Sequence, residues 1–402
     1  MNKEAFKIEG RDIVIISIQP WYYPLGSNCK NIALELSKHN RVLYVNIPIT
    51  RKTFYQKSKE PGVSEHCTII KNKENTIRQV KMNLWQLYPV TIIESINKIP
   101  FTPLFRLLNK INNKRFCHDI ALAVGELGFS NIILFNDNDI YNGFYLKELL
   151  QPECYVYYMR DFLQGYAFWK KHCSVLEPEL ISKSDLVVTN SVFYRDYCLN
   201  YNSKSVYMGQ GCNLDNFDAT KSHPKPRDMA MDKQPIIGYT GALDSNRLNH
   251  EIIRIIAETH PEWNIVLVGP EDEEFKKSTL HNISNIKFKG AKHMNELPAY
   301  VQHFDVCINP QKINTATQGN YPLKVDEYLA MGKPVVATHT KTMELFQKHT
   351  FLAKTPREYP GLIEKALAGK SQEEQIARIA FAHSHTWANS VEILYAALKQ
   401  KY

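Results

Sequence analysis

Short apolar segments alternate with amphipathic ones along most of the chain, and this alternation constrains the fold more than any other feature. Residues 12–18 (DIVIISI) form an apolar run of strand length, residues 29–38 show the spacing of a helix, and residues 41–47 (RVLYVNI) form the next run. Strands that are apolar at nearly every position are buried on both faces, as in parallel sheets. The pattern therefore predicts an α/β fold with a buried parallel sheet.

The first half of the chain continues this alternation and ends in a polar segment. Further strand-like runs follow at residues 131–135 (NIILF), 154–159 (CYVYYM) and 186–189 (LVVT), and residues 206–211 close this half. Residues 221–234 (KSHPKPRDMAMDKQ) are polar, contain proline and show no periodicity, as interdomain linkers do. We expect an N-terminal domain over residues 1–220 and a linker over residues 221–234.

A second alternation follows this linker. Its strand-like runs lie at residues 236–239, 264–268, 286–288, 306–309 and 335–338, and its helical patterns at residues 249–259, 295–304 and 323–331. Two such units joined by one linker form a cleft between the carboxyl ends of their strands, where open α/β sheets bind ligands. We expect the second domain over residues 235–385 and a helix within residues 386–402 that crosses back to the first domain.

Length and charge exclude several classes of protein. At 402 residues the chain is long for one core and should hold two or three domains. Its net charge of +8 suits an anionic ligand or lipid head group but is sparse for a nucleic-acid-binding protein. Residues 1–12 lack the apolar core of a signal peptide, and no apolar run reaches the ~18 residues of a spanning helix. We expect no nucleic-acid partner and a cytoplasmic protein, either soluble or peripheral on the inner face of the cytoplasmic membrane.

Cysteine and histidine spacing predicts no metal site. The 8 cysteines are scattered without a CxxC pair, and the histidines form no HExxH pattern. Reduced thiols are expected in a cytosolic protein.

Residues 101–116 (FTPLFRLLNKINNKRF) combine apolar and basic side chains at helical spacing. Phe105, Leu107, Leu108 and Ile111 supply the apolar part, with lysine and arginine between them. Such a basic amphipathic helix can rest on an anionic membrane surface. An ordinary surface helix with its apolar face in the core has the same pattern, so both interpretations stay open.

Residues 318–338 (QGNYPLKVDEYLAMGKPVVAT) read as a loop, a short helix that ends at Gly332, and a strand. Lys324 and Glu327 stand three residues apart and so share one face of the helix, beside backbone N–H groups that favour anions. A phosphate and a sugar hydroxyl could both be held there. The alternative is an ordinary exposed ion pair between the two side chains.

Two strand-end turns of the second half add possible ligand contacts. Gly238 and Gly241 follow one another near a strand end, where small residues let a diphosphate approach, and Arg247 is placed to bind a phosphate. The turn that contains Lys292 and His293 belongs to the same row of loops, and its backbone can read the edge of a nucleobase. Glycine in such turns often serves turn geometry alone.

The second half contains, in this order, the segments IGYTGALDSNRL, NIVLVGP, NIKFKGAKHMNELPAYVQHFDVCINP and PLKVDEYLAMGKPVVAT. Their order and spacing resemble the donor-binding half of retaining glycosyltransferases of the GT4 type. In the first half, SKSDLVVTNS and GQGCNLDNF resemble the segments before that family's interdomain linker. The resemblance implies the GT-B fold, in which two Rossmann-like parallel-sheet domains face each other across a cleft.

The resemblance also implies roles for residues of the donor side. Glu327 matches the second glutamate of the family's motif of two glutamates, which holds the ribose hydroxyls of the nucleotide. The first glutamate, which contacts the donor sugar, falls on Gly319, so this sequence departs from the motif. The loop that includes Asn320 would then contact the sugar, and Lys324 with Arg247 would contact the diphosphate.

On the acceptor side, the resemblance implies that the first domain holds the acceptor and places a polar residue under the sugar. Asp161, next to Arg160 at a strand end, is the first candidate, and Asp137 is the second. A strand-end carboxylate that only caps a helix is the alternative for each. In the loop of Gly26, Ser27 and Asn28, either polar residue can cap the following helix, while the glycine lets backbone approach a ligand.

The resulting expectation is an enzyme that transfers a sugar from a nucleotide-diphosphate sugar to a glycan or lipid-linked acceptor, in the synthesis of a cell-surface polysaccharide or glycoconjugate. Cations and helix N-termini can stabilise the departing diphosphate, so we expect no cofactor and no metal. Asp137, Asn138 and Asp139 spell the DxD pattern of metal-dependent glycosyltransferases of another fold, but they lie in the half that does not bind the nucleotide. A nucleotide-sugar epimerase and a non-catalytic carbohydrate- or lipid-binding subunit are the alternatives.

Overall fold

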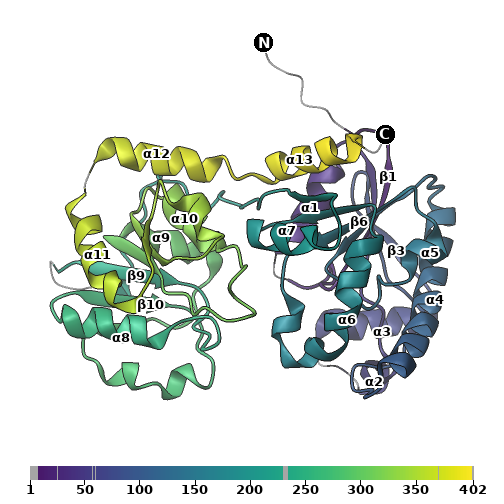
Figure 1. Ribbon diagram of the computed structural model, residues 1–402, viewed down its shortest axis with the longest axis horizontal. Helices are drawn as coiled ribbons and strands as arrows, with labels where there is room; N and C mark the ends of the chain where they lie inside the picture. The colour runs from purple at the N-terminus through teal and green to yellow at the C-terminus, as the bar shows by residue number, and fades with distance from the viewer. Residues whose placement is uncertain are drawn as a thin grey trace, which may run out of the picture. The chain divides into compact units, whose positions relative to one another are not determined.

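The chain folds into two compact units (Figure 1). Unit 1 comprises Met1–Gln210 and Trp387–Tyr402, and unit 2 comprises Gly211–Thr386. The computed structural model describes residues 8–24, 26–56, 58, 60–229, 234–369 and 371–400.

The chain passes from unit 1 to unit 2 before the segment predicted as the linker. Leu214 and Phe217, expected in the N-terminal domain, bury their side chains in the core of unit 2. Of the predicted linker, Met229 is buried in the same core, and the backbone N–H of His223 donates to the side-chain oxygen of Gln302 at 2.6 Å. These contacts make residues 211–229 part of unit 2. Residues 230–233 lie outside the described residues.

The described residues of unit 1 form an eight-stranded sheet in the order β3-β4-β2-β1-β5-β6-β7-β8. Every pairing is parallel except that of β3 with β4. The strands are β1 (Asp12–Ser17), β2 (Arg41–Val45), β3 (Ile77–Lys81), β4 (Leu84–Leu87), β5 (Ile133–Asp137), β6 (Cys154–Met159), β7 (Leu186–Thr189) and β8 (Ser205–Tyr207). The helices are α1 (Asn28–Leu36), α2 (Arg51–Tyr55), α3 (Pro61–Asn72), α4 (Thr102–Glu126), α5 (Leu146–Leu150), α6 (Ala167–Lys183), α7 (Val192–Leu199) and α13 (Trp387–Lys399).

Helices cover both faces of this sheet, which is why its strands are apolar throughout. Alternate residues of β1 point to opposite faces, so Val14 packs with α4 and α6, while Ile15 packs with α1 and α13. The final helix α13 runs beside α1 in unit 1, as Figure 1 shows. Its Val391 and Leu394 are buried there.

The antiparallel strands β3 and β4 were not predicted from the sequence. β3 lies at the edge of the sheet and its residues are only partly buried, so it carries no apolar run. Within the same region, α4 extends for 25 residues from Thr102, well beyond the predicted helix at residues 101–116.

The described residues of unit 2 form a second, six-stranded parallel sheet in the order β11-β10-β9-β12-β13-β14. Its strands are β9 (Ile236–Thr240), β10 (Asn264–Val268), β11 (Ile286–Phe288), β12 (Val306–Asn309), β13 (Val335–Thr338) and β14 (Phe351–Ala353). Its helices are α8 (His250–Thr259), α9 (Leu297–Gln302), α10 (Leu323–Ala330), α11 (Tyr359–Ala368) and α12 (Gln372–His383). Helices α8 and α11 cover one face, and α9, α10 and α12 the other. The prediction of two Rossmann-like parallel-sheet domains is confirmed.

Candidate functional site

The strand order of unit 2 marks one position as the natural ligand site. From β9 the sheet grows toward β10 and β11 on one side and toward β12 and β13 on the other. Open α/β sheets bind ligands at this switch point, outside the carboxyl ends of the strands. In unit 2 the switch point lies where Gly241 follows β9 and Asn309 ends β12.

Gly241 forms a turn at the switch point that accepts no larger residue. Its φ of +132° lies in the region that side chains disfavour, and its N–H donates to the carbonyl of Val268 at 2.9 Å. A Cβ at this position would lie 2.9 Å from Nζ of Lys324 and 3.2 Å from the hydroxyl of Tyr239. The missing side chain therefore leaves room for the ammonium group. Gly238 differs, because it lies within β9 and its hydrogen faces the ring of Phe304.

Lys324, at the start of α10, points at this turn. Its ammonium lies 4.2 Å from the centroid of the Tyr239 ring and hydrogen-bonds to the Tyr239 hydroxyl. The helix is anchored to the same strand end by Tyr328, whose hydroxyl accepts from the backbone N–H of Thr240 at 2.8 Å. No side chain caps the N-terminus of α10 at Pro322. Positive charge thus gathers beside the glycine turn.

Glu327 lies one turn further along α10 and is half-buried. Burial raises the pKa of this carboxyl to about 7; the charge of Lys324 opposes the shift, and that of Asp326 adds to it. A perturbed carboxyl beside a helix N-terminus at a switch point is a functional-site candidate. Lys324 and Glu327 both lie on α10, three residues apart, and their roles in ligand binding stay predictions.

Arg247 lies on a loop that is joined to the segment before α10. Its backbone carbonyl accepts from Lys312 at 2.8 Å, and the neighbouring carbonyl of Asn246 accepts from Asn314 at 2.7 Å. The Arg247 side chain is 54% exposed, and its Nε lies 3.9 Å from a carboxylate oxygen of Asp244. Two loops at the carboxyl edge of the sheet are thus held together, with the guanidinium on their surface.

Asn309 lies at the same switch point and was not predicted from the sequence. It is buried at the end of β12, and its Nδ2 has no hydrogen-bond partner among the described residues. Buried polar groups are nearly always hydrogen-bonded, so an orphan donor at a switch point indicates a ligand or water. Asn309 is the last residue of a strand-like run, and this position in the sequence could have indicated a polar residue at the ligand-binding edge of the sheet.

A buried network behind α10 was also missed. The Asp326 carboxylate lies 2.7 Å from Nδ1 of His385 and accepts from the Tyr321 hydroxyl at 2.8 Å. Burial raises the pKa of Asp326, and the hydrogen bond and positive charge of His385 oppose the shift. Because the partners are 59 and 5 residues away, no local pattern revealed this contact. It fixes the opposite side of the helix that carries Lys324 and Glu327.

Two predicted donor residues have local structural partners. The Lys292 ammonium pairs with Asp228 at 2.8 Å, and this interaction raises its pKa. The His293 side chain caps the short helix η5 (Met294–Glu296), in a reciprocal pair with Glu296. Their roles in nucleotide binding stay predictions.

The position of the missing first glutamate lies in a turn. Gly319 is buried, and its carbonyl accepts from the hydroxyl of Thr342 at 3.3 Å. The backbone N–H of Asn320 donates to the carbonyl of Thr317 at 3.0 Å. Hydrogen bonds within the chain therefore define the shape of this loop.

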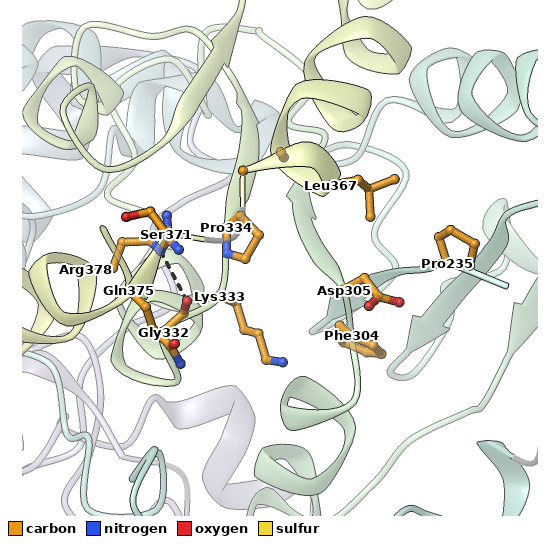
Figure 2. A pocket seen from close by; sticks show the side chains of 12 residues that line it. Pro235, Phe304, Asp305, Gly332, Lys333, Pro334, Leu367, Ser371, Gln375 and Arg378 are labelled. Atoms are coloured by element: carbon orange, nitrogen blue, oxygen red, sulfur yellow. Dashed lines mark hydrogen bonds between the residues drawn. The ribbon is translucent and has the colours of Figure 1, made fainter. Parts of the chain in front are cut away.

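Figure 2 shows a pocket of about 460 Å³ in unit 2 that lies elsewhere. Pro235, Asp305 and Pro334, which line it, immediately precede or open the strands β9, β12 and β13. Its floor includes Gly332, whose carbonyl accepts from Nε of Arg378 at 3.1 Å. Because the pocket lies at the amino edge of the sheet, it is not the switch-point site.

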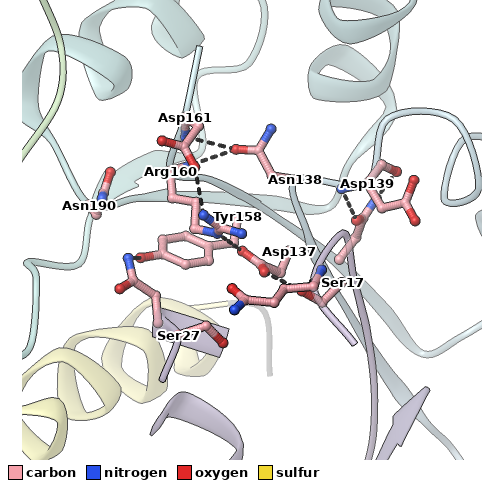
Figure 3. Close-up of polar contacts among 12 residues, drawn as sticks. Ser17, Ser27, Asp137, Asn138, Asp139, Tyr158, Arg160, Asp161 and Asn190 are labelled. Atoms are coloured by element: carbon pink, nitrogen blue, oxygen red, sulfur yellow. Dashed lines mark hydrogen bonds and ion pairs between the residues drawn. The ribbon is translucent and has the colours of Figure 1, made fainter. Parts of the chain in front are cut away.

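Unit 1 has its own switch point, between β1 and β5, and charged groups meet there (Figure 3). Asp137 at the end of β5 is fully buried, accepts from the Ser17 hydroxyl at 2.5 Å and pairs with Nε of Arg160 at 2.7 Å. Arg160 also binds Asp161 at 2.6 Å, and the Asp161 side chain is 30% exposed. Asp137 is thus a buried anchor, while Asp161 is the carboxylate that reaches solvent.

Two amides at this edge keep unused hydrogen-bonding atoms. Asn138 has a φ of +56°, and its Oδ1 accepts from the N–H groups of Arg160 and Asp161 at 2.8 and 2.9 Å. Its Nδ2 and the Oδ1 of Asn190 are buried, with no partner among the described residues. One donor and one acceptor are therefore available at the carboxyl edge of unit 1, as recognition of a hydroxyl group requires.

The predicted acceptor-side loop lies at the start of α1. Ser27 is the N-cap and accepts from the backbone N–H of Lys30 at 3.2 Å, while Asn28 exchanges hydrogen bonds with Gln210 at 2.8 and 3.0 Å. A Cβ on Gly26 would meet nothing within 4 Å. The structural interpretation of Ser27 as a helix cap is confirmed.

The DxD pattern does not form a pair of free carboxylates. Asp137 is paired with Arg160, whereas Asp139 is buried and accepts from the backbone and side chain of Asn142, each at 2.9 Å. Within the described ranges, no three His, Cys, Asp or Glu residues form a metal-binding group.

Helix α4 buries only part of the apolar face predicted within residues 101–116. Phe105 and Phe116 are buried in the core of unit 1, whereas Leu104 and Leu107 are 45% and 58% exposed. Among the described residues, no helix is long and apolar enough to cross a membrane.

Solved structures share this fold across almost the whole chain. Sucrose-phosphate synthase from Thermosynechococcus elongatus aligns with a TM-score of 0.67 and 14% identity, covering 98% of this chain and 100% of that one. Anabaena Alr3699/HepE in complex with UDP gives a TM-score of 0.65 at 14% identity, covering 98% and 100%. The α,α-trehalose-phosphate synthase (UDP-forming) from Burkholderia vietnamiensis gives 0.69 at 11% identity, covering 98% of each chain. The fold is that of the GT-B glycosyltransferases.

Sequence comparison finds similarity to glycosyltransferases in part of the chain. Residues 234–368, which lie within unit 2, match the family model described as glycosyl transferases group 1. A curated relative, "Putative teichuronic acid biosynthesis glycosyltransferase TuaH" of Bacillus subtilis, is 27% identical over 189 residues, which are 45% of this chain. The match spans about half of that relative, 47% of its length. In sequence and fold, the chain is therefore similar to glycosyltransferases of group 1.

Proposed function

We propose that this protein is a retaining glycosyltransferase of the GT4 type that transfers a sugar from a nucleotide-diphosphate sugar to a glycan or lipid-linked glycan. The observation that carries the proposal is the gathering of Gly241, Lys324 and Glu327 at the switch point of a group 1 domain. That site combines a turn open to a phosphate, a preplaced ammonium and a carboxylate able to accept from ribose hydroxyls.

In this proposal, unit 2 binds the donor. Glu327 accepts hydrogen bonds from the ribose, Lys324 and the exposed Arg247 neutralise the diphosphate, and the orphan amide of Asn309 donates to the donor. The loop of Asn320 approaches the sugar in place of the absent glutamate at Gly319. Lys292 and His293 lie on the loop after β11 and are proposed to contact the base, with Lys292 held there by Asp228.

Unit 1 is proposed to bind the acceptor at its own carboxyl edge. Asp161, oriented by Arg160, together with Asn138 and Asn190, supplies groups that hydrogen-bond to sugar hydroxyls. The loop of Gly26, Ser27 and Asn28 borders the same edge, because Asn28 donates to the hydroxyl of Tyr158 at 3.3 Å.

The reaction breaks the bond between the anomeric carbon and the diphosphate and forms one to the acceptor hydroxyl. The transition state carries positive charge on the sugar and growing negative charge on the diphosphate. Lys324, Arg247 and the uncapped start of α10 stabilise the diphosphate, because fixed positive charges act where the negative charge develops. These cations supply the stabilisation without a metal ion or other cofactor.

The relative named for teichuronic acid biosynthesis supports a cell-surface polysaccharide or glycoconjugate as the product. Such acceptors are often held at a membrane, so we place the protein in the cytoplasm, peripheral to the inner face of the cytoplasmic membrane. The exposed leucines of α4, together with Lys110 and Lys114 of the same helix, support this surface contact. We expect no nucleic-acid partner.

The proposal is tested by calorimetric titration of UDP, GDP and ADP into the full chain. One of these nucleotides should bind. Glu327→Ala should lower the affinity for it by about tenfold or more, because a charged hydrogen bond to the ribose is lost. Glu373→Ala changes an exposed glutamate of α12 and should leave the affinity unchanged. Absence of nucleotide binding, or equal binding by Glu327→Ala, refutes the proposal.

A nucleotide-sugar panel with and without acceptors separates the alternatives. A transferase needs the acceptor for sugar transfer, whereas an epimerase converts its nucleotide sugar without one. A non-catalytic subunit would bind glycan without either reaction.

A further inference from the structure

A separate pocket of about 580 Å³ opens at the carboxyl edge of unit 1. It begins where the polar network of Figure 3 ends, because Ile18 follows Ser17 at the end of β1, and Asp139 lies two residues beyond Asp137. Residues after β2, residues 93–98 after β4, part of α4 and the start of α6 also contribute to its wall. The pocket therefore adjoins the site proposed for the acceptor sugar.

The wall of this pocket is largely apolar. Its side chains include Ile18, Ile47, Ile93, Ile96, Phe168 and Trp169. The rings of Trp169 and Tyr141 lie 5.0 Å apart, and Tyr141 also lines the pocket. A pocket of this size with aromatic and aliphatic walls is suited to an organic ligand rather than to water.

Several polar residues of the wall have partners within the chain, and the Glu94 carboxylate, which also lines the pocket, pairs with Arg51 and Arg115. The Asp139 carboxylate accepts from Asn142, and Asn109 donates to the carbonyl of Tyr141 at 3.0 Å. Asn112 both accepts from the backbone of Glu94 at 2.9 Å and donates to it at 3.0 Å. What the pocket offers a ligand is therefore mainly apolar surface.

Two exposed lysines and an exposed phenylalanine also line the pocket. Lys52 and Lys98 line it and are exposed, so they provide positive charge at its opening. Phe168 also lines it, yet is 59% exposed, and its helix α6 packs against α4 through the Arg106–Glu179 ion pair. Apolar surface thus continues from the pocket onto the outside of unit 1, beside cations.

We propose that this pocket receives the aliphatic chain of a lipid-linked acceptor whose phosphate lies near Lys52 and Lys98. An apolar cavity, a cationic opening and an adjoining hydroxyl-binding edge match the three chemical parts of such a molecule. A free sugar would leave the pocket empty, and a neutral lipid would not use the lysines. The inference rests on the proposed function, since it names the acceptor class of that reaction.

Farnesyl phosphate is the probe, titrated into the full chain with tryptophan fluorescence as the signal. Farnesol and inorganic phosphate are the control ligands. Farnesol carries the aliphatic chain of the probe without its phosphate, and inorganic phosphate carries the charge without the chain. Farnesyl phosphate should bind about tenfold or more tightly than either, because chain burial and charge pairing act together. Equal affinity for inorganic phosphate would overturn the role of the chain, and equal affinity for farnesol would overturn the role of the lysines.

Two variants locate the binding. Trp169→Ala removes an aromatic wall, and Ser95→Trp fills the pocket from an exposed position on its rim. Each should weaken the binding of farnesyl phosphate about tenfold. Because both variants change a tryptophan or add one, calorimetry replaces fluorescence as the measurement. Leu122→Asn alters exposed apolar surface of α4 outside the pocket and should have no effect. Equal binding by all variants, or none by the wild type, overturns the inference.

Nucleotide titration of the same samples separates this inference from the proposed function. Variants that keep nucleotide affinity are folded, so their loss of farnesyl phosphate is specific to the pocket. Nucleotide binding without farnesyl phosphate binding refutes the lipid pocket alone. Farnesyl phosphate binding without any nucleotide binding refutes the transferase and leaves the pocket as a lipid site.

Discussion

Nζ of Lys324 lies 4.2 Å from the centroid of the Tyr239 ring and donates a hydrogen bond to its hydroxyl. The contact joins the first turn of α10 to β9 at the switch point of unit 2. It holds a flexible side chain in place before a ligand binds, which reduces the ordering cost of binding. The room for this ammonium exists because residue 241 is glycine.

Lys324→Met should lower the affinity for the nucleoside diphosphate by about tenfold or more, because a charged contact to phosphate is lost. The corresponding nucleoside, which has no phosphate, should bind wild type and variant alike. Calorimetric titration of both ligands makes the comparison, and Lys324→Arg should recover part of the affinity. An equal loss for the nucleoside would contradict a phosphate contact.

The pH dependence of nucleotide binding should follow Glu327, whose pKa burial raises to about 7. Ribose hydroxyls donate to the ionised carboxylate, so affinity should rise as pH increases through about 7. Glu327→Gln should lose this dependence. A wild-type affinity that is constant from pH 6 to pH 8 would contradict the role of the carboxylate.

The raised pKa of Glu327 should also affect the stability of the fold. Stability should fall as pH rises, whereas nucleotide affinity should increase. The folded state retains the Glu327 proton that the unfolded state releases from its ordinary pKa of 4.5 upward. Because the folded state binds more protons in this window, the free energy of unfolding should fall as pH rises from about 4.5 to about 7. Glu327→Gln should show a smaller fall in urea denaturation at the two pH values.

Asp137 and Asp161 should respond differently to loss of charge. Asp137→Asn removes the fully buried carboxylate of the ion pair with Arg160 and should cost about 3–5 kcal/mol of unfolding free energy. Asp161 is 30% exposed, so Asp161→Asn should cost less than about 1 kcal/mol. Denaturation measures both, and a sugar-transfer assay should show a loss for Asp161→Asn in a stable protein. Full activity of that variant would exclude its role at the acceptor.

Gly269→Ala should destabilise unit 2 and weaken nucleotide binding. Its φ is +156°, and a Cβ would lie 1.9 Å from the carbonyl oxygen of Gly241, so the donor-site turn would have to move. The loss should exceed the ~1 kcal/mol of an ordinary glycine effect. Gly361→Ala in α11, where a Cβ meets nothing within 4 Å, is the control and should be neutral or stabilising. Thermal unfolding with and without nucleotide makes the comparison.

Binding to anionic vesicles should depend on the first half of α4. Leu107→Asn removes apolar surface that is 58% exposed beside Lys110 and should weaken binding about tenfold. Leu122→Asn, 59% exposed further along the same helix, is the matched control. Cosedimentation should also show weaker binding at high salt. Equal binding of the wild type to neutral and anionic vesicles would contradict a charge-assisted membrane contact.

The parallel strands of both units could be predicted, because a strand buried on two faces must be apolar throughout. β6, β7, β10 and β13 have the predicted bounds. The edge strand β3 could not be predicted, since it is half-exposed and its residues are not apolar throughout. The division between the units was misplaced, because the polar composition of residues 221–234 does not show that their backbone packs on unit 2.

The sequence alone determined the fold class, the resemblance of the second half to a family, and the placement of Lys324 and Glu327 on one helix face, because these depend on local spacing. The tertiary structure decided what those residues meet: Tyr239 beneath Lys324, the buried Asp326–His385 contact behind the helix, and the orphan amide of Asn309. It also separated Asp137, a buried anchor, from Asp161, an accessible carboxylate. These properties arise from contacts between distant segments, and no local spacing encodes burial or a partner of that kind.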